Sequence, residues 1–369
     1  MSKAAELANL IGNINAGGGG VNRNVIINGA MNVAQRATSA TGLGGSDPSY
    51  QTLDRFRMNI GGTSAGRFTM AQDSSAPEGF ANSLKLTCTT DDTSIANDEL
   101  LSLQQRIEGQ NLQMFAKGTT SAKPYAVSFY VKGNASATYT CELEDGDNSR
   151  RVAKEFSVTT DWTRVELSFP KDTTGAFDDD SALSLSLNIF LHGGNNFTSG
   201  TFSANTWESI SNTTRLSDSQ TSFFDSTDRT FFITGVQLEV GQNPTSFEHE
   251  PFETTLRKCQ RFFCQTFNYG TTAANNTSTN GSFMLGNSAS NYEPSVTWRY
   301  PVEMNHAPDV TTFNPESGST GQWSAGGGTV GSNVRALFIG TSSCVCDNTD
   351  TTLAGGNSWR VHLTADCEL

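Results

Sequence analysis

Short apolar runs separated by turn-forming residues make up most of the chain. From Val21 onward, Gly, Asn, Asp, Ser and Thr divide these runs, a pattern typical of strands joined by turns. Within residues 126–132, Val127, Phe129 and Val131 alternate with more polar positions. Alternation with a period of two gives a strand one apolar face and one mixed face. The pattern therefore predicts sandwich strands and an all-β fold.

Eight runs before residue 250 carry this strand pattern. They are residues 24–29, 83–89, 123–133, 137–145, 151–159, 163–170, 182–191 and 229–241. Residues 100–115 fit either a helical turn or a strand crossing, and both alternatives stay open. After Pro251, Leu256, Cys259 and Phe263 are spaced for a short helix that turns into a strand. More β runs follow, which predicts a second, smaller β-sandwich of about 115 residues.

The first residues follow a different period. Leu7, Leu10, Ile11 and Ile14 occupy positions i, i+3, i+4 and i+7, which places them in one stripe on a three-turn helix. A helix this short is unstable alone, so it needs a partner surface. The glycines at 17–20 provide a flexible joint after it. We predict an anchor helix that attaches or oligomerises the protein; the alternative is a frayed terminus with an accidental stripe.

These patterns divide the 369 residues into three parts. We expect an N-terminal anchor and glycine hinge at 1–20, a larger β-sandwich domain at 21–250 and a C-terminal β-sandwich at 251–369. No 20-to-50-residue repeat is visible, which argues against a β-helix.

Charge and cysteine usage narrow the function. The formal net charge is −13 with only 24 Lys and Arg, so we expect neither nucleic-acid binding nor attraction to an anionic membrane. The chain has no run of 18 apolar residues and no cationic, apolar export signal at its start. We therefore expect synthesis in a host cytoplasm and no membrane insertion. The seven cysteines are scattered and odd in number, which predicts buried free thiols and no disulfide framework.

Several motifs occur in the order seen in one group of phage proteins. They are NVIINGAMNVAQRAT, TLDRF, SFYVKG, EDGDNSR, DWTRVELSFP, FFITGVQLEVG, FEHEPFETTLRKCQRFF and WRYPVEMNHAPDV, which together span residues 24–310. In these motifs the chain resembles the phage tail-fibre and virion structural proteins that carry a carbohydrate-binding-like jelly-roll module. The acidic loop at 178–180 and the polar insert at 209–229 depart from many relatives.

The resemblance implies a jelly-roll, carbohydrate-binding-module-like fold for residues 21–250 and a non-enzymatic structural component of a tailed-phage virion. A homotrimeric tail-fibre subunit would be attached to other virion proteins by its N-terminus and would meet a host-cell surface glycan, where avidity offsets weak single contacts. Two alternatives stay open: a head or tail decoration protein without receptor contact, and a glycan depolymerase.

The candidate catalytic and metal residues are few. His192, His249, His306 and His362 lie in unrelated contexts without a G-x-S-x-G turn, and no carboxylate pair stands out, so no catalytic residue is expected. No cofactor is expected either, although two oxygen-rich loops could hold Ca²⁺. These loops contain Asp145, Asp147 and Asn148, and the acidic residues 178–180. The simpler interpretation is a hairpin turn for the first and solvated charge for the second.

Trp323 is the candidate glycan contact. It lies in the sequence GQWSAGGG, and glycine-rich surroundings indicate an exposed loop in which its ring could stack on a sugar. The remaining tryptophans are expected in the core, as for Trp298 within a strand pattern.

Overall fold

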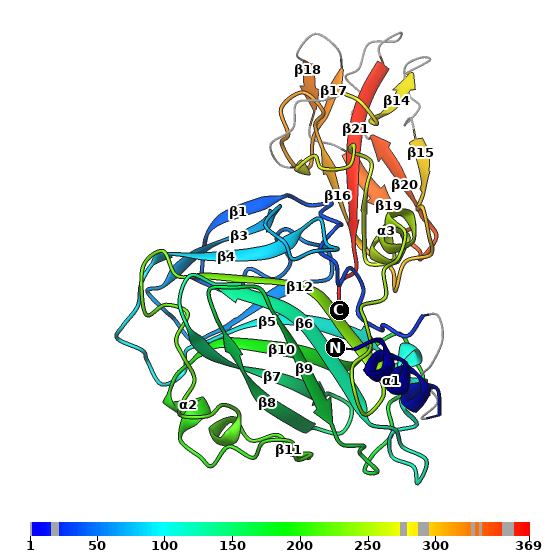
Figure 1. Ribbon diagram of the computed structural model, residues 1–369. Helices are drawn as coiled ribbons and strands as arrows, with labels where there is room; N and C mark the ends of the chain where they lie inside the picture. Colours follow the sequence, from blue (N-terminus) through cyan, green and yellow to red (C-terminus); the bar gives the residue numbers. More distant parts are fainter. Residues whose placement is uncertain are drawn as a thin grey trace. The chain divides into compact units, whose positions relative to one another are not determined.

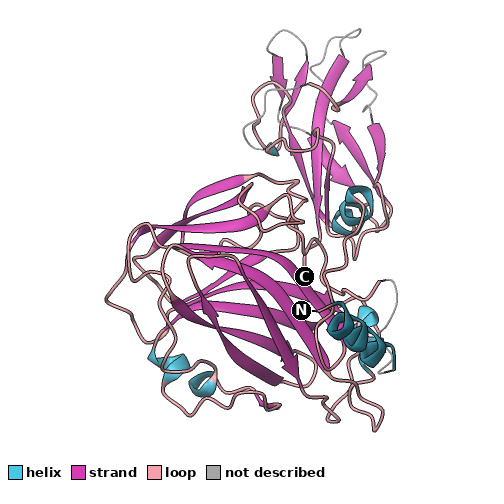
Figure 2. Ribbon diagram, in the orientation of Figure 1, coloured by secondary structure: helices cyan, strands magenta, loops and turns pink. Residues whose placement is uncertain are grey.

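A computed structural model describes residues 2–15, 22–273, 279–286, 295–325, 329–331, 334–348 and 358–369. The chain forms two compact units. The first comprises Met1–Asn32, Ser39–Pro251 and Leu369, and the second comprises Val33–Thr38 and Phe252–Glu368. Strands dominate the described residues in both units (Figure 2). None of the described helices has the length and apolar character needed to cross a membrane.

The first unit contains two six-stranded antiparallel sheets, as a jelly-roll sandwich requires (Figure 1). The first sheet has the strand order β1 (Ser39–Leu43), β3 (Arg67–Asp73), β4 (Ser83–Thr90), β12 (Thr230–Val240), β6 (Tyr125–Gly133) and β9 (Thr163–Phe169). The second has the order β11 (Glu208–Ser209), β8 (Arg150–Val158), β7 (Ala137–Asp145), β10 (Leu183–Gly193), β5 (Leu100–Glu108) and β2 (Arg57–Gly61).

Alternating apolar side chains from the two sheets form the core of this unit. In β6, Val127, Phe129 and Val131 are completely buried, which confirms the face assigned from the sequence. In β10, Leu187 and Asn188 are both buried although they lie on opposite faces. The outer face of the second sheet is thus covered as well, by the polar insert, which includes η3 (Asn212–Thr214) and follows the short helix α2 (Asn195–Thr198).

Seven of the eight expected strands are confirmed within one or two residues at most ends. The exception is 24–29, which forms bends and turns. Its apolar pattern reflects tertiary contacts: the Gln105 side chain bonds to both the amide and the carbonyl of Ile27, at 2.7 and 2.9 Å. Residues 100–115, which the sequence left open, form β5 followed by the turns η1 (Gly109–Asn111) and η2 (Gln113–Phe115).

The second unit is a smaller β-sandwich. Helix α3 (Phe252–Gln260) leads into β13 (Phe263–Gln265), as the spacing of apolar residues predicted. The nine-residue strand β21 (Ser358–Asp366) is its central element and pairs with four others, namely β13, β14 (Phe283–Gly286), β16 (Asp309–Phe313) and β17 (Trp323–Ala325). The remaining strands are β18 (Thr329–Gly331), which pairs with β17, and the sheet of β15 (Ser295–Arg299), β20 (Ser343–Asn348) and β19 (Val334–Leu337).

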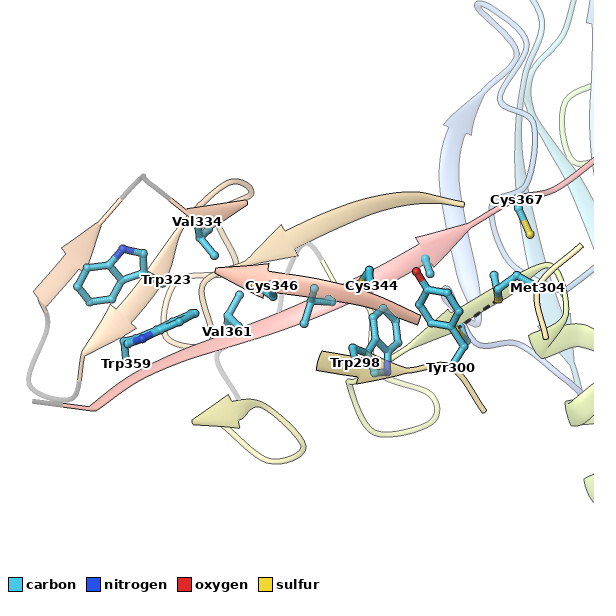
Figure 3. Close-up of a cluster of buried hydrophobic side chains, with 13 residues drawn as sticks. Trp298, Tyr300, Met304, Trp323, Val334, Cys344, Cys346, Trp359, Val361 and Cys367 are labelled. Carbon is cyan, nitrogen blue, oxygen red and sulfur yellow. Dashed lines mark hydrogen bonds between the residues drawn. The ribbon is translucent and has the colours of Figure 1, made fainter. Parts of the chain in front are cut away.

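Trp323 lies in the core of this second unit, so the expectation of an exposed loop is wrong. Its side chain is 1% exposed and meets Trp359 edge to face, with ring centroids 6.4 Å apart (Figure 3). A Cβ atom at Gly331 would lie 2.3 Å from the indole ring of Trp323. The ring therefore fills the space beside a glycine of the paired strand β18. The neighbouring glycine allows close packing and does not mark an exposed loop.

Residues 3–14 form the expected N-terminal helix, α1 (Lys3–Asn15). Leu7 and Ile11 are 56% and 50% exposed, and Leu10 is half-buried. The side chain of Ile14 and the glycine hinge at 17–20 lie outside the described residues. The helix thus presents apolar surface to solvent in a single chain, which is the property that an anchor or oligomer contact needs.

Candidate functional site

Four aromatic side chains from three separate segments gather on the outer face of the first sheet. Phe80 precedes β4, Tyr130 lies in β6, and Phe247 and His249 follow β12. The ring centroid of Phe80 lies 5.4 Å from that of Tyr130, 5.0 Å from Phe247 and 5.1 Å from His249. They line a hollow of about 580 Å³, a volume within the range of small-molecule sites. We call it the aromatic hollow.

A glycine bulge in β12 makes room for these rings. The register of β12 against β6 shifts between Thr234 and Gln237, and Gly235 has a φ of +64°. A Cβ atom at Gly235 would lie 2.8 Å from Phe80 and 2.9 Å from Tyr130. The positive φ and the missing side chain both require glycine at this position. The TGVQLEVG motif of the sequence thus has a local structural role, since its glycine lies against two of the rings that line the aromatic hollow.

Two buried polar residues of the same motif hold the segment that carries Phe247 and His249. The Glu239 carboxylate accepts hydrogen bonds from the amide of Thr245 at 2.6 Å and from its hydroxyl at 2.8 Å. The Gln237 side chain donates to Glu239 at 2.9 Å and accepts from the amide of Glu248 at 2.8 Å. Both side chains are completely buried. They are positioning residues, because they fix the backbone on either side of Phe247.

Glu248 extends this arrangement to the N-terminal arm. Its carboxylate accepts backbone hydrogen bonds from Asn22, Arg23 and Asn24 at 2.7, 2.6 and 2.9 Å. Asn24 in turn accepts a bond from the amide of Leu238 in β12 at 3.0 Å. Three successive amides directed at one carboxylate form a strong, charge-assisted contact. Because Phe247 and His249 flank Glu248, they are directed away from this contact and into the hollow.

Charged side chains form the rim of the aromatic hollow. They are Glu78, Arg164 and Glu166, with Glu6 of α1, and the exposed Ser246 completes the lining. The Arg164 guanidinium is bound by the Glu166 carboxylate and by the Thr245 carbonyl, with a longer bond of 3.4 Å to Ser128. Its charge is therefore paired. Glu78 is exposed beside Phe80. The rim offers carboxylate oxygens to a ligand more readily than cations.

Helix α1 lies beside the aromatic hollow within the first unit. Leu7 and Leu10 line a second hollow of about 380 Å³ together with Arg23 and Thr245. Part of the predicted apolar stripe is thus close to the jelly roll, while half of the Leu7 and Ile11 surface stays exposed.

At the first candidate calcium loop, the ammonium group of Lys117 takes the position that a metal cation would occupy. The Lys117 ammonium, completely buried, lies 2.6 Å from an Asp145 oxygen and donates to the Thr174 and Gly175 carbonyls at 2.7 and 2.8 Å. Asn148 also bonds to Asp145, at 3.0 Å. Residues 146–149 form the β7–β8 hairpin turn, which confirms the simpler interpretation. Lys117 supplies the positive charge that those oxygens would otherwise offer to a metal ion.

The remaining calcium candidates do not converge on one point. Asp147 accepts a bond from the Asp178 amide at 3.0 Å, and the side chains at 178–180 are exposed. Within the described ranges, no three His, Cys, Asp or Glu side chains are grouped as a metal site. All seven cysteines are buried free thiols, as expected. Burial raises the pKa of the Cys88 thiol to about 11 and that of Cys346 to about 12, so both stay protonated at neutral pH.

The fold also assembles a serine, a histidine and a carboxylate that the sequence did not connect. His192 in β10 lies 2.8 Å from the Ser222 hydroxyl and 3.0 Å from a Glu99 oxygen. His192 and Glu99 are 1% and 2% exposed. Desolvation lowers the pKa of His192 despite the Glu99 carboxylate, so the ring is neutral. The Ser222 hydroxyl also accepts the Phe224 amide at 3.0 Å, and neither hollow described above includes it. The trio fastens the polar insert to the second sheet.

The sequence predictions missed the aromatic hollow. Its rings come from Phe80, Tyr130, Phe247 and His249, and no single motif contains all four. One signal was present: Phe247 and His249 alternate with Glu248 a few residues after the TGVQLEVG strand. An aromatic pair at alternating positions presents both rings on one side of an extended segment.

Comparisons with known proteins give no family assignment. No family model matches the chain, and no curated protein matches it. Among solved structures, a family 11 carbohydrate-binding module from Clostridium thermocellum, in complex with a β-1,3-1,4-mixed-linked tetrasaccharide, covers 58% of this chain and 99% of its own, at 10% identity and a TM-score of 0.28. TmCBM61 in complex with β-1,4-galactotriose covers 59% of this chain and 99% of its own, at 14% identity and a TM-score of 0.28.

A phage protein is also among the similar structures. The enzymatically active domain of tailspike protein 4 from bacteriophage CBA120 covers 59% of this chain and 21% of that chain, at 12% identity and a TM-score of 0.30. Similarity at this level does not assign a function.

Proposed function

We propose that this chain is a non-enzymatic structural component of a tailed-phage virion, a homotrimeric tail-fibre subunit that binds a host-surface glycan. The aromatic hollow is the observation that carries the proposal. It combines four ring side chains with carboxylate and hydroxyl groups in about 580 Å³. Sugars have apolar ring faces and hydroxyl edges, and a site that combines aromatic faces with a few polar groups is complementary to both.

The N-terminus supplies attachment in this proposal. Helix α1 leaves Leu7 and Ile11 half exposed, and burial of these side chains in a trimer or on the particle would remove apolar surface from water. The bonds from Glu248 to residues 22–24 connect that arm directly to the segment that carries Phe247. A trimer would present three aromatic hollows, so weak single contacts would add to a stable adsorption.

Binding of labelled full-length protein to intact host cells tests the proposal. We expect saturable binding by a trimer, with oligomeric mass read by light scattering, and loss of most of that binding in Phe247→Ala. The matched control is Phe338→Ala, because Phe338 is 85% exposed in the second unit and outside the hollow. Equal adsorption by wild type and Phe247→Ala contradicts the glycan contact. No adsorption by a folded trimer supports the alternative of a decoration protein.

A glycan depolymerase is the second candidate, because Glu78 and Glu166 place two carboxylates in the same hollow as the rings. Glycosidic cleavage uses such a pair as acid and base or nucleophile. Release of reducing ends from host polysaccharide measures this directly. Under our proposal wild type releases none, whereas release that is lost in Glu78→Gln would establish the enzyme.

A further inference from the structure

We propose that the aromatic hollow selects sugars without acidic groups, so that its ligands are neutral or amino-bearing pyranoses. This inference rests on the proposed function and specifies the ligand class of the same site. Its basis is the charge around the rings. The lining contains three carboxylates, from Glu6, Glu78 and Glu166, and one guanidinium, from Arg164.

Arg164, the one lysine or arginine among the described residues that line the hollow, is already bound. Arg164 is paired with Glu166 and also bonds to the Thr245 carbonyl and Ser128. A uronate or sialate carboxylate at the guanidinium would have to share its charge with Glu166, and it would meet the exposed charge of Glu78. Like charges at close range raise the free energy of the complex, most strongly where the rings exclude water. The net charge of −13 on the chain adds to this repulsion at longer range.

The same carboxylates favour the binding of neutral and amino sugars. A sugar hydroxyl donates hydrogen bonds, and a carboxylate is acceptor-only and strong as an acceptor. The exposed Glu78 carboxylate has no ion-pair partner among the described residues, so it can accept hydroxyl hydrogens. An ammonium group gains further attraction from the carboxylates and from the faces of Phe80, Tyr130 and Phe247. The same rings accommodate the apolar face of the pyranose in either case.

Oligosaccharides of matched length and three charge types test the inference on the full-length protein: neutral hexose, free-amine hexosamine and uronate. We expect wild type to bind the first two and to bind the uronate about ten-fold or more weakly. The double variant Glu78→Gln/Glu166→Gln should bring the uronate to within about three-fold of the neutral sugar. The control Asp179→Asn/Asp218→Asn removes two exposed carboxylates outside the hollow and should leave the preference unchanged.

Salt and the ring variants complete the test. Neutral-sugar affinity should be the same at low and high salt, whereas the discrimination against uronate should shrink as salt screens the carboxylates. Phe247→Ala should weaken all bound sugars about ten-fold or more. Preferential binding of the uronate by wild type overturns this inference and leaves the glycan-binding function standing. Binding of no sugar, by protein that is folded and trimeric, overturns both.

Discussion

The aromatic side chains of the two units differ in what surrounds them. Phe80 and Phe247 in the first unit are half-buried and line a hollow, whereas Trp323 and Trp359 in the second are 1% and 0% exposed. One ring of each pair lies against a glycine whose missing side chain makes room for it: Phe80 against Gly235 in the first unit, and Trp323 against Gly331 of β18 in the second. Glycine near an aromatic residue therefore indicates close packing, and it does not distinguish a binding surface from a core.

The position of each ring relative to the strands distinguishes the core from the binding surface. Trp359 alternates with Val361, Leu363 and Ala365 along β21, the strand to which four others pair, and all four side chains are completely buried (Figure 3). Phe247 instead lies on an irregular segment whose backbone is held by buried polar side chains. Rings on such segments can stay accessible because no second sheet packs over them.

Truncation of Trp323 should have the largest effect and sharpen this comparison. We expect Trp323→Ala to lower the free energy of unfolding by about 3–5 kcal/mol, because it removes a large buried side chain and leaves a cavity. Phe247→Ala should cost less than about half of that, since the ring is half-buried. Urea unfolding measures both, and sugar binding should be lost only in Phe247→Ala. A folded Trp323→Ala protein that no longer binds sugar would restore Trp323 as the contact.

A methyl group at Gly235 should have the next largest effect. Gly235→Ala adds a side chain at a positive φ and against Phe80, so we expect a loss of about 1–3 kcal/mol in unfolding free energy and loss of sugar binding. Gly42 has a φ of +70°, and a Cβ atom added there would have no neighbouring atom within 4 Å. Gly42→Ala therefore serves as the control. It should lose only about 1–2 kcal/mol in unfolding free energy, from backbone strain alone, and its sugar binding should be unchanged. Equal binding by both variants would show that the rings do not depend on the bulge.

The sequence predicted the strands better than the site, for a physical reason. Strands such as β7 and β12 follow from local alternation, which depends on neighbours two residues apart. Helix α3 and the strand β13 that follows it were also predictable, because the spacing of Leu256, Cys259 and Phe263 is a local helical pattern. The aromatic hollow depends on Phe80, Tyr130 and Phe247 meeting across a bulge. The alternation of Phe247 and His249 is a local signal, but it does not show which distant residues these rings meet. The strand prediction for residues 24–29 was wrong because hydrogen bonds from the Gln105 side chain to the backbone of Ile27 take the place of a strand ladder.

Removal of the Glu248 charge should have a smaller, local effect. In Glu248→Gln the amide oxygen is a weaker acceptor for the amides of residues 22–24, so we expect a loss of about 1–2 kcal/mol in this region. Hydrogen exchange at Asn22, Arg23 and Asn24 should accelerate, and exchange in β21 of the second unit should not change. Faster exchange in both regions would show a general loss of stability and no specific contact. Sugar affinity should fall in parallel, because Glu248 lies between Phe247 and His249.

Acidification should give the smallest effect and tests a region away from the hollow. Burial lowers the pKa of His192 in the folded chain, so the unfolded chain binds a proton more readily. The neutral ring then contributes stability above the ordinary histidine pKa of about 6.5, and this contribution is lost as pH falls from there through the lower folded pKa. His192→Gln keeps an amide beside Glu99 and removes the titration, so its unfolding free energy should change less between about pH 7.5 and about pH 5.5 than that of wild type. Identical slopes for the two proteins would mean that folding leaves the pKa of His192 unshifted. A wild-type stability that rises relative to that of His192→Gln as the pH falls would mean that the histidine is charged in the fold and that its bond to Glu99 outweighs burial. The Ser222–His192–Glu99 trio would then be an ion pair, and its role in fastening the polar insert would strengthen at low pH.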